Sequence, residues 1–127
     1  MPKVIETGAS PSVKLAKIAS VIDEYRVVIN AGKKDGVEIG HRFLIYKIGD
    51  EIFDPDRKES LGRIEVVKGK GEVIHVQDRM ATLQTTEKHE IQRRPMGLLA
   101  IAQSLEVTKE PKAFIEPEVG DIARFIG

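Results

Sequence analysis

The sequence contains no cysteine and few aromatic residues. Without cysteine the chain cannot form disulfides, thiolate-bound zinc or iron–sulfur sites, or use a thiol nucleophile. The most apolar stretch, residues 97–102, is far shorter than the roughly 20 residues that span a bilayer. The first eight residues lack the apolar core of a signal peptide. We therefore expect no membrane span, no cofactor and a cytoplasmic location as the sequence is written, or a periplasmic or envelope location if a signal peptide has been removed.

An excess of charge of either sign is also missing. The 20 basic and 20 acidic side chains give a formal net charge of zero. The chain as a whole therefore has no strong field to attract nucleic acid or anionic lipid. Its 127 residues, 41% of them apolar, suit one soluble domain with a single core.

Short segments rich in β-branched residues follow one another along the chain and predict strands. These segments cover residues 25–30, 42–48, 63–67, 72–76, 80–85 and 119–126. The apolar spacing of residues 15–22 fits a helix or a strand, and the strand that follows favours a strand. Turn residues lie between the segments: Asn30, Gly32, Asp35, Gly36, Gly40, Gly62 and Gly120. We predict an all-β fold, a small closed or partly open barrel of about six or seven mostly antiparallel strands.

Other segments are predicted to interrupt or precede the strands. Residues 1–12 are expected to form an N-terminal arm, and residues 13–127 a single barrel domain. We expect a polar loop at residues 49–61 and a break between two strands at Gly69-Lys70-Gly71. A long insertion at residues 87–117 is dense in charge and interrupted by prolines. Within it, residues 98–107 are expected to form an edge strand or a short helix.

The insertion is the predicted interaction element, because a long excursion from a compact domain is usually functional or disordered. Its apolar residues are Leu98, Leu99, Ile101 and Leu105. Two interpretations stay open. These side chains mediate self-association, or they cap the core of their own barrel.

Acidic residues concentrate in the predicted loop at residues 49–61. Asp54, Asp56 and Glu59 can supply oxygen ligands to calcium. The glycine and spacing of an EF-hand loop are absent, and Pro55 is typical of a turn. A solvated hairpin tip is the favoured interpretation, and a calcium site is the alternative.

Motifs for catalysis are missing from the sequence. His41, His75 and His89 lack the spacing of zinc ligands. No serine lies in a Gly-x-Ser-x-Gly elbow, and no glycine-rich segment has the frame of a phosphate-binding loop. We therefore predict that the protein is not an enzyme.

Nucleic-acid binding is the main alternative to protein binding, because small barrels often bind nucleic acid. Basic side chains occur in two groups that can form patches: Lys68, Lys70 and Arg79, and Lys88, Arg93 and Arg94. Binders of single strands also need aromatic stacking platforms. The four phenylalanines and two tyrosines mostly lie in strand patterns typical of a core. Nucleic acid is therefore the less favoured partner.

Two short segments are alike. In Val37-Glu38-Ile39-Gly40-His41 and in Glu118-Val119-Gly120-Asp121, an apolar residue and a glycine precede a predicted strand. Turn chemistry recurs for local reasons. We interpret the pair as two similar turns that lead into two barrel strands, rather than as a duplication.

Glycines and apolar positions form a longer pattern over residues 25–76. Its elements are Val28-Ile29-Asn30-Ala31-Gly32, Asp35-Gly36-Val37, Gly40, Phe43, Tyr46, Glu51-Ile52-Phe53-Asp54-Pro55, Leu61-Gly62, Glu65, Gly71-Glu72-Val73 and the closing Val119-Gly120-Asp121. This pattern resembles the C-terminal β-barrel module of the flagellar assembly protein T family. The resemblance implies a small bacterial barrel with a structural or assembly role, a protein partner or self-association into a homo-oligomer, and no catalytic residues.

Overall fold

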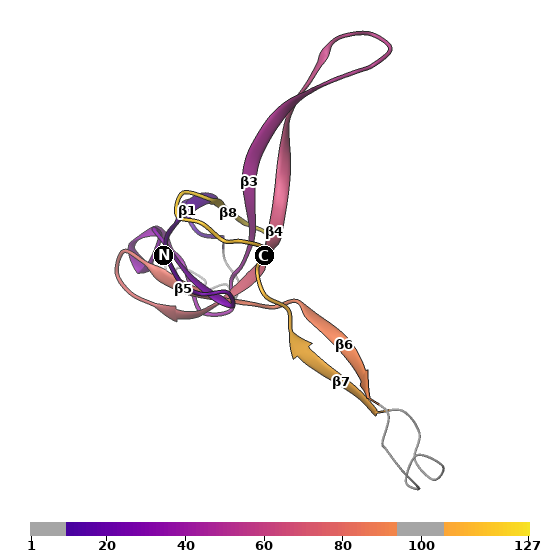
Figure 1. Cartoon of the computed structure of the whole chain (residues 1–127). Helices are drawn as coiled ribbons and strands as arrows, with labels where there is room; N and C mark the ends of the chain where they lie inside the picture. Colours follow the sequence, from indigo (N-terminus) through magenta and orange to yellow (C-terminus); the bar gives the residue numbers. More distant parts are fainter. Residues whose placement is uncertain (1–9, 94–105) are drawn as a thin grey trace, which may run out of the picture.

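The computed structural model of the protein describes residues 10–93 and 106–127 (Figure 1). Six of the strands in these ranges close into an antiparallel barrel, in the order β1-β2-β5-β4-β3-β8. They are β1 (Leu15–Asp23), β2 (Arg26–Ile29), β3 (Arg42–Phe53), β4 (Ser60–Val76), β5 (Ala81–Thr85) and β8 (Ile122–Phe125). The predicted all-β barrel is therefore confirmed. No helix within the described ranges is long and apolar enough to cross a membrane.

The predicted insertion leaves the barrel as a separate hairpin. Strands β6 (Lys88–Arg93) and β7 (Glu106–Pro111) pair antiparallel in a two-stranded sheet of their own. Figure 1 shows this hairpin extending away from the barrel. The proposed interaction residues Leu98, Leu99, Ile101 and Leu105 lie outside the described residues, as does most of the expected edge strand or helix at 98–107.

The core fills the inside of the barrel through the two-residue period of its strands. Val27 and Ile29 on β2, Phe43 and Ile45 on β3, and Leu83 on β5 are all fully buried. Side chains at alternate positions point inward from neighbouring strands, so a ring of strands encloses one continuous apolar cluster.

Closure of the ring depends on the last strand. β8 pairs with β1 on one side and with β3 on the other. Ala123 lies opposite Ala16 in one register and opposite Ile45 in the other, and it is fully buried. The barrel therefore closes only when residues more than 100 positions apart in the sequence come together.

The expected polar loop at residues 49–61 is wrong. β3 continues to Phe53 and β4 begins at Ser60, so only residues 54–59 form a turn. Glu51 pairs with Arg63, and Ile52 pairs with Gly62. The segment forms a hairpin although many of its side chains are polar, because backbone pairing satisfies the N–H and C=O groups of polar and apolar residues alike.

The expected break at Gly69-Lys70-Gly71 is also wrong, because β4 runs without interruption for 17 residues. The reason is the packing of Phe114 against the two glycines. A Cβ atom added at Gly69 would lie 2.7 Å from Phe114 Cδ1, and one at Gly71 would lie 3.2 Å from Phe114 Cζ. Glycine inside a strand often marks such a close approach. Here the two glycines let the segment that returns from β7 pack directly onto the barrel.

The two similar sequence segments form two matching turns. Gly40 and Gly120 have φ of 94° and 97°, which glycine adopts without steric cost. In the first turn, the Glu38 N–H donates to Nδ1 of His41 (3.1 Å). In the second, the Glu118 N–H donates to Oδ2 of Asp121 (2.8 Å). Each turn thus buries a polar side chain at the entrance to a barrel strand, β3 in one case and β8 in the other.

The last residues of the predicted N-terminal arm pack on the barrel. Pro11 is fully buried, and the backbone N–H and the hydroxyl of Ser12 both donate to the carbonyl oxygen of Asp35 (2.8 and 2.9 Å). Asp35 belongs to the 3-10 turn η1 (Lys33–Asp35) between β2 and β3. Residues 1–9 of the predicted arm lie outside the described residues.

Truncation of the core tests this description. We expect Leu83→Ala to lower the free energy of unfolding by about 2–5 kcal/mol, because it removes buried methyl groups and leaves a cavity. Ile39→Ala is the control, since Ile39 is 69% exposed, and its effect is expected to stay within about 0.5 kcal/mol. Urea denaturation measures both values. Equal values for the two variants would contradict the assigned core.

Candidate interaction surface

The β3–β4 hairpin projects beyond the barrel as a two-stranded ribbon (Figure 1). β3 pairs with β8 only at residues 43–46, and β4 pairs with β5 only at residues 71–76. Residues 47–53 and 60–67, called the ribbon below, pair with each other and with no further strand among the described residues. Both outer edges of the ribbon therefore present unpaired backbone groups, which is the usual template for adding another strand.

The ribbon also exposes apolar side chains. All of the following are between 42% and 63% exposed: Ile52, Phe53, Leu61, Ile64, Val66 and Val67. A two-stranded hairpin is only marginally stable alone in water, and stability normally requires a third strand or a packing partner. Clustered exposed apolar side chains commonly mark interaction sites. The ribbon thus combines free edges with an apolar surface.

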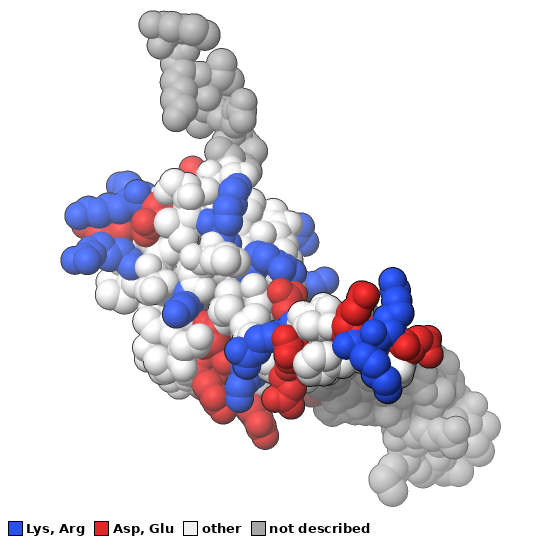
Figure 2. Space-filling model, turned by 90° about the horizontal axis from the view of Figure 1, so that it is seen from above, with Lys and Arg blue, Asp and Glu red and all other residues white. Residues whose placement is uncertain are grey.

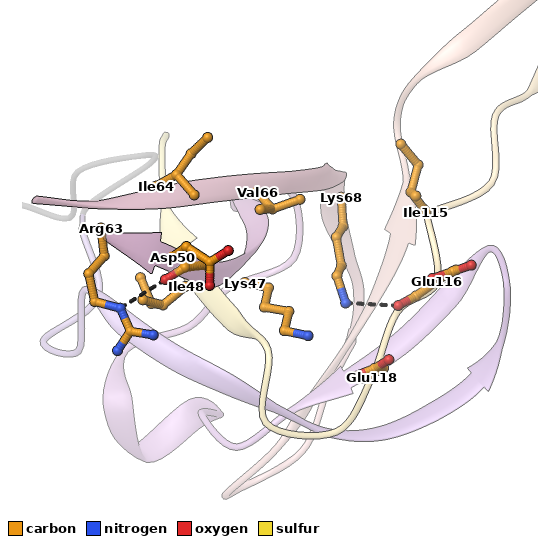
Figure 3. A pocket seen from close by; sticks show the side chains of 11 residues that line it. Lys47, Ile48, Asp50, Arg63, Ile64, Val66, Lys68, Ile115, Glu116 and Glu118 are labelled. Atoms are coloured by element: carbon orange, nitrogen blue, oxygen red, sulfur yellow. Dashed lines mark hydrogen bonds between the residues drawn. The ribbon is translucent and has the colours of Figure 1, made fainter. Parts of the chain in front are cut away.

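A groove runs between the ribbon and the segment that leads into β8 (Figure 3). Its volume is about 560 Å³, and Ile64 and Val66 line it on the side of β4. Ile115, Glu116 and Glu118 line it on the opposite side. The lining is mixed, with apolar side chains of the ribbon facing acidic and apolar residues of the returning segment.

Gly49 shapes the groove from β3. A Cβ atom added at Gly49 would lie 2.7 Å from Cγ2 of Ile64 and 3.3 Å from Cγ2 of Val66. The absence of a side chain therefore lets these two residues lie across the neighbouring strand. The Arg63 guanidinium turns back to the same place, where its Nε donates to the Gly49 carbonyl oxygen (2.8 Å; Figure 3).

A buried ion pair forms the base of the groove. Lys68 Nζ lies 2.7 Å from Asp121 Oδ2, and the two side chains are 6% and 5% exposed. Lys68 also donates to the carbonyl oxygen of Glu116 (2.9 Å), and Asp121 also accepts from the Glu118 N–H (2.8 Å). Each charge is therefore paired and hydrogen-bonded, which buried charges require. The ion pair joins β4 to the segment that precedes β8.

Sequence reasoning missed this ion pair and placed Lys68 in a possible basic patch. The structure separates Lys68 from such a patch, because its ammonium group is buried against Asp121. One signal was present in the sequence. The matching turns place Asp121 where the other turn places His41, and both positions point into the domain.

Asp54, Asp56 and Glu59 lie at the tip of the hairpin, as the favoured interpretation expects. Asp54 Oδ1 accepts from the N–H groups of Asp56 (2.8 Å) and Arg57 (3.2 Å), so this carboxylate caps the turn. Oδ2 of Asp54 lies 3.5 Å from Nε of Arg57. Among the side chains that the structure describes, residues 10–88 and 109–127, no three of Asp, Glu, His or Cys are arranged to hold a metal ion.

The histidines do not meet in one place. His41 is buried, and its ring packs edge-on against Phe125 with the centroids 5.0 Å apart. Because its Nδ1 accepts from a backbone N–H, the proton of the neutral ring is placed on Nε2, 3.6 Å from Oε2 of Glu38. His75 is exposed on β4, and the side chain of His89 lies outside the described part. The described histidines therefore form no shared site.

Charges of both signs mix over the surface. Figure 2 shows lysine and arginine side chains interspersed with aspartate and glutamate on the face seen from above. A single-strand binder needs exposed aromatic rings, but Phe43, Tyr46 and Phe114 are buried and Phe125 is partly buried against the core. Tyr25 and Phe53 are exposed, and each lies at the tip of a different hairpin, β1–β2 and β3–β4.

Comparison with known proteins adds no relative: no family model matches the chain, and no curated protein matches it in sequence. The resemblance to the flagellar assembly protein T module therefore stays a prediction.

Removal of Asp121 tests the role of the buried pair. Asp121→Ala leaves the Lys68 ammonium buried without its partner, so we expect a loss of about 3–5 kcal/mol in the free energy of unfolding. Adding Lys68→Met to this variant removes the lone charge and is expected to restore part of the loss. Glu87→Ala, which breaks the exposed pair with Lys112, is the control and is expected to cost less than about 1 kcal/mol. Similar losses for Asp121→Ala and Glu87→Ala in urea denaturation would show that the buried pair contributes no more to the free energy of unfolding than the exposed pair.

Proposed function

We propose that the protein is a non-enzymatic interaction or assembly module that binds a protein partner through the ribbon and the adjoining groove. The observation that carries this proposal is the exposure of the whole β4 edge. Every residue from Ser60 to Val67 is exposed, although this part of β4 is paired with β3 and is rich in β-branched side chains. A long, apolar, unpaired strand edge is a surface that proteins normally cover.

The use made of the charged groups supports binding over catalysis. Lys68 and Asp121 neutralise each other, and Asp54 caps the hairpin turn. The Arg63 guanidinium spans the ribbon to Gly49. These groups hold the backbone in place, and none of them is paired with a second group in the manner of a nucleophile and its base.

Strand addition is the recognition mode that fits the ribbon. In this mode an extended segment of the partner forms main-chain hydrogen bonds with a free sheet edge, and side-chain pockets add specificity. The ribbon supplies the edge, and the groove beside Ile64 and Val66 supplies a concave surface next to it. The barrel then acts as the rigid base that holds the ribbon away from the rest of the molecule (Figure 1).

Photo-crosslinking in the source cell tests the proposal. A photoreactive phenylalanine analogue at Val66 is expected to give protein adducts, because Val66 is exposed on the ribbon and lines the groove. The same analogue at Lys33 is the control, since Lys33 is exposed on η1, at the end of the barrel away from the ribbon. We expect at least about tenfold fewer adducts there, since a specific interface covers only a limited part of the surface. An absence of protein adducts at Val66, or equal yields at both positions, would rule out the ribbon as the contact surface.

A further inference from the structure

The free edge of β4 has a sequence that is complementary to itself. The central residues of this edge read Gly62-Arg63-Ile64-Glu65-Val66. When two such edges pair antiparallel about a two-fold axis at Ile64, Arg63 of each copy lies opposite Glu65 of the other. Opposite charges directly across a pair of strands are favourable, and like charges are unfavourable. Two such cross-strand ion pairs form in this register, related by the axis.

The apolar residues fit the same register. Ile64 lies opposite Ile64 of the second copy, and Val66 lies opposite Gly62. Gly62 has φ of 97° and lies at a bulge of β4, so the regular pairing runs between Gly62 and Val66. Arg63 and Glu65 are two residues apart and share one face of β4, while Ile64 and Val66 share the other. The joint sheet would therefore have one charged, complementary face and one apolar face.

The length of the free edge also suits a two-fold pair. The carbonyl oxygen of Lys68 already accepts a hydrogen bond from the Ile115 N–H (2.9 Å), so the edge ends there. Antiparallel pairing about Ile64 places the two barrels at opposite ends of the joint sheet. The hairpin tip of each copy then lies beside the groove of the other, at the point where the edge is closed.

Other pairings of the ribbon with itself are unfavourable. On the outer edge of β3, a two-fold axis near Asp50 or Glu51 sets carboxylates against carboxylates, and the β3–β4 register shifts between Ile48 and Glu51. Like charges directly opposite each other are unfavourable, so this edge is a poor partner for itself. On β4, an axis at Glu65 would place two carboxylates opposite each other. Only an axis at Ile64 gives opposite charges in both cross-strand positions.

In the single chain both charged side chains lean across β3, away from the free edge, and they turn toward the second copy on pairing. Arg63 uses one guanidinium N–H for the Gly49 carbonyl oxygen, which leaves the donors of the two terminal nitrogens. Glu65 lies 3.5 Å from Arg124, and these two side chains are 43% and 41% exposed. Such an exposed pair is weak and does not compete strongly with a new partner.

We propose that the partner of the ribbon is a second copy of this chain, bound through antiparallel pairing of the two β4 edges about Ile64. The two ribbons then form one four-stranded sheet in a two-fold symmetric dimer. This proposal rests on the proposed function, since it names the partner of the same surface. A two-fold dimer needs a self-complementary patch, which this edge supplies.

Charge exchange tests the register. Arg63→Glu makes the edge acidic at both positions, and Glu65→Arg makes it basic at both. We expect each variant to dimerise at least about tenfold more weakly than the wild type, because both cross-strand pairs become repulsive. An equimolar mixture of the two variants is expected to form a heterodimer, and the double variant Arg63→Glu/Glu65→Arg to recover the homodimer. Sedimentation velocity measures the association, and circular dichroism of each variant checks its fold.

A cysteine placed on the axis gives a second measurement that does not depend on the charged variants. The chain has no cysteine of its own. Ile64→Cys is expected to oxidise to a covalent dimer, because residues directly opposite on antiparallel strands have Cβ atoms close to disulfide distance. Ile39→Cys is the control, since Ile39 is 69% exposed and lies just before β3, at the opposite end of that strand from the ribbon. We expect its covalent dimer to form more slowly.

The outcomes separate this proposal from the proposed function. A wild-type protein that stays monomeric at about 100 µM, a dimer that neither charge variant weakens, or a mixture that does not recover association would each overturn the β4 dimer. If adducts at Val66 nevertheless contain a different protein, the ribbon still binds a partner and only the second copy is wrong. If Val66 gives no protein adducts, both proposals fail together.

Discussion

Closure of the barrel by β8 is the constraint on which the rest of the structure depends. A strand of four residues joins β1 to β3 and so removes the two edges that a six-stranded sheet would otherwise expose. The buried Lys68–Asp121 pair secures this closure from the side of β4. Because charges that leave water must be paired, the position of Asp121 before β8 is coupled to the position of Lys68 on β4. Lys68 of this pair also lines the groove between the ribbon and the returning segment.

Closure also explains why the ribbon stands out. The ring of pairings closes the barrel, and the projecting parts of β3 and β4 lie beyond it with free outer edges. The barrel is stabilised by a filled core, whereas the ribbon has exposed residues on both faces. A rigid base that carries an unsupported apolar hairpin is an arrangement suited to contact with another chain.

The candidate surface was only partly predictable. Asp54 and Pro55 correctly indicate a hairpin tip, but the partly polar side chains on both sides of it predict a loop where the structure has strands. Lys68 looked like a surface cation, and nothing near it in sequence shows that Asp121, 53 positions later, is its partner. The interaction residues predicted in the insertion lie outside the described part. Of the exposed apolar residues of the ribbon, Ile64 and Val66 are predicted in a barrel strand, and Ile52, Phe53 and Leu61 in a loop.

The sequence by itself determined the local features: β-branched segments of two-residue period, glycines that permit left-handed turns at Gly40 and Gly120, and the matching hydrogen bonds of those turns. These features depend on residues close together in the chain, so local chemistry suffices to specify them. Tertiary structure alone decided that β4 passes unbroken through Gly69 and Gly71, because Phe114 must pack on them, and that β3 and β4 extend beyond the ring. Those outcomes depend on contacts between segments distant in sequence, whose geometry no local pattern contains.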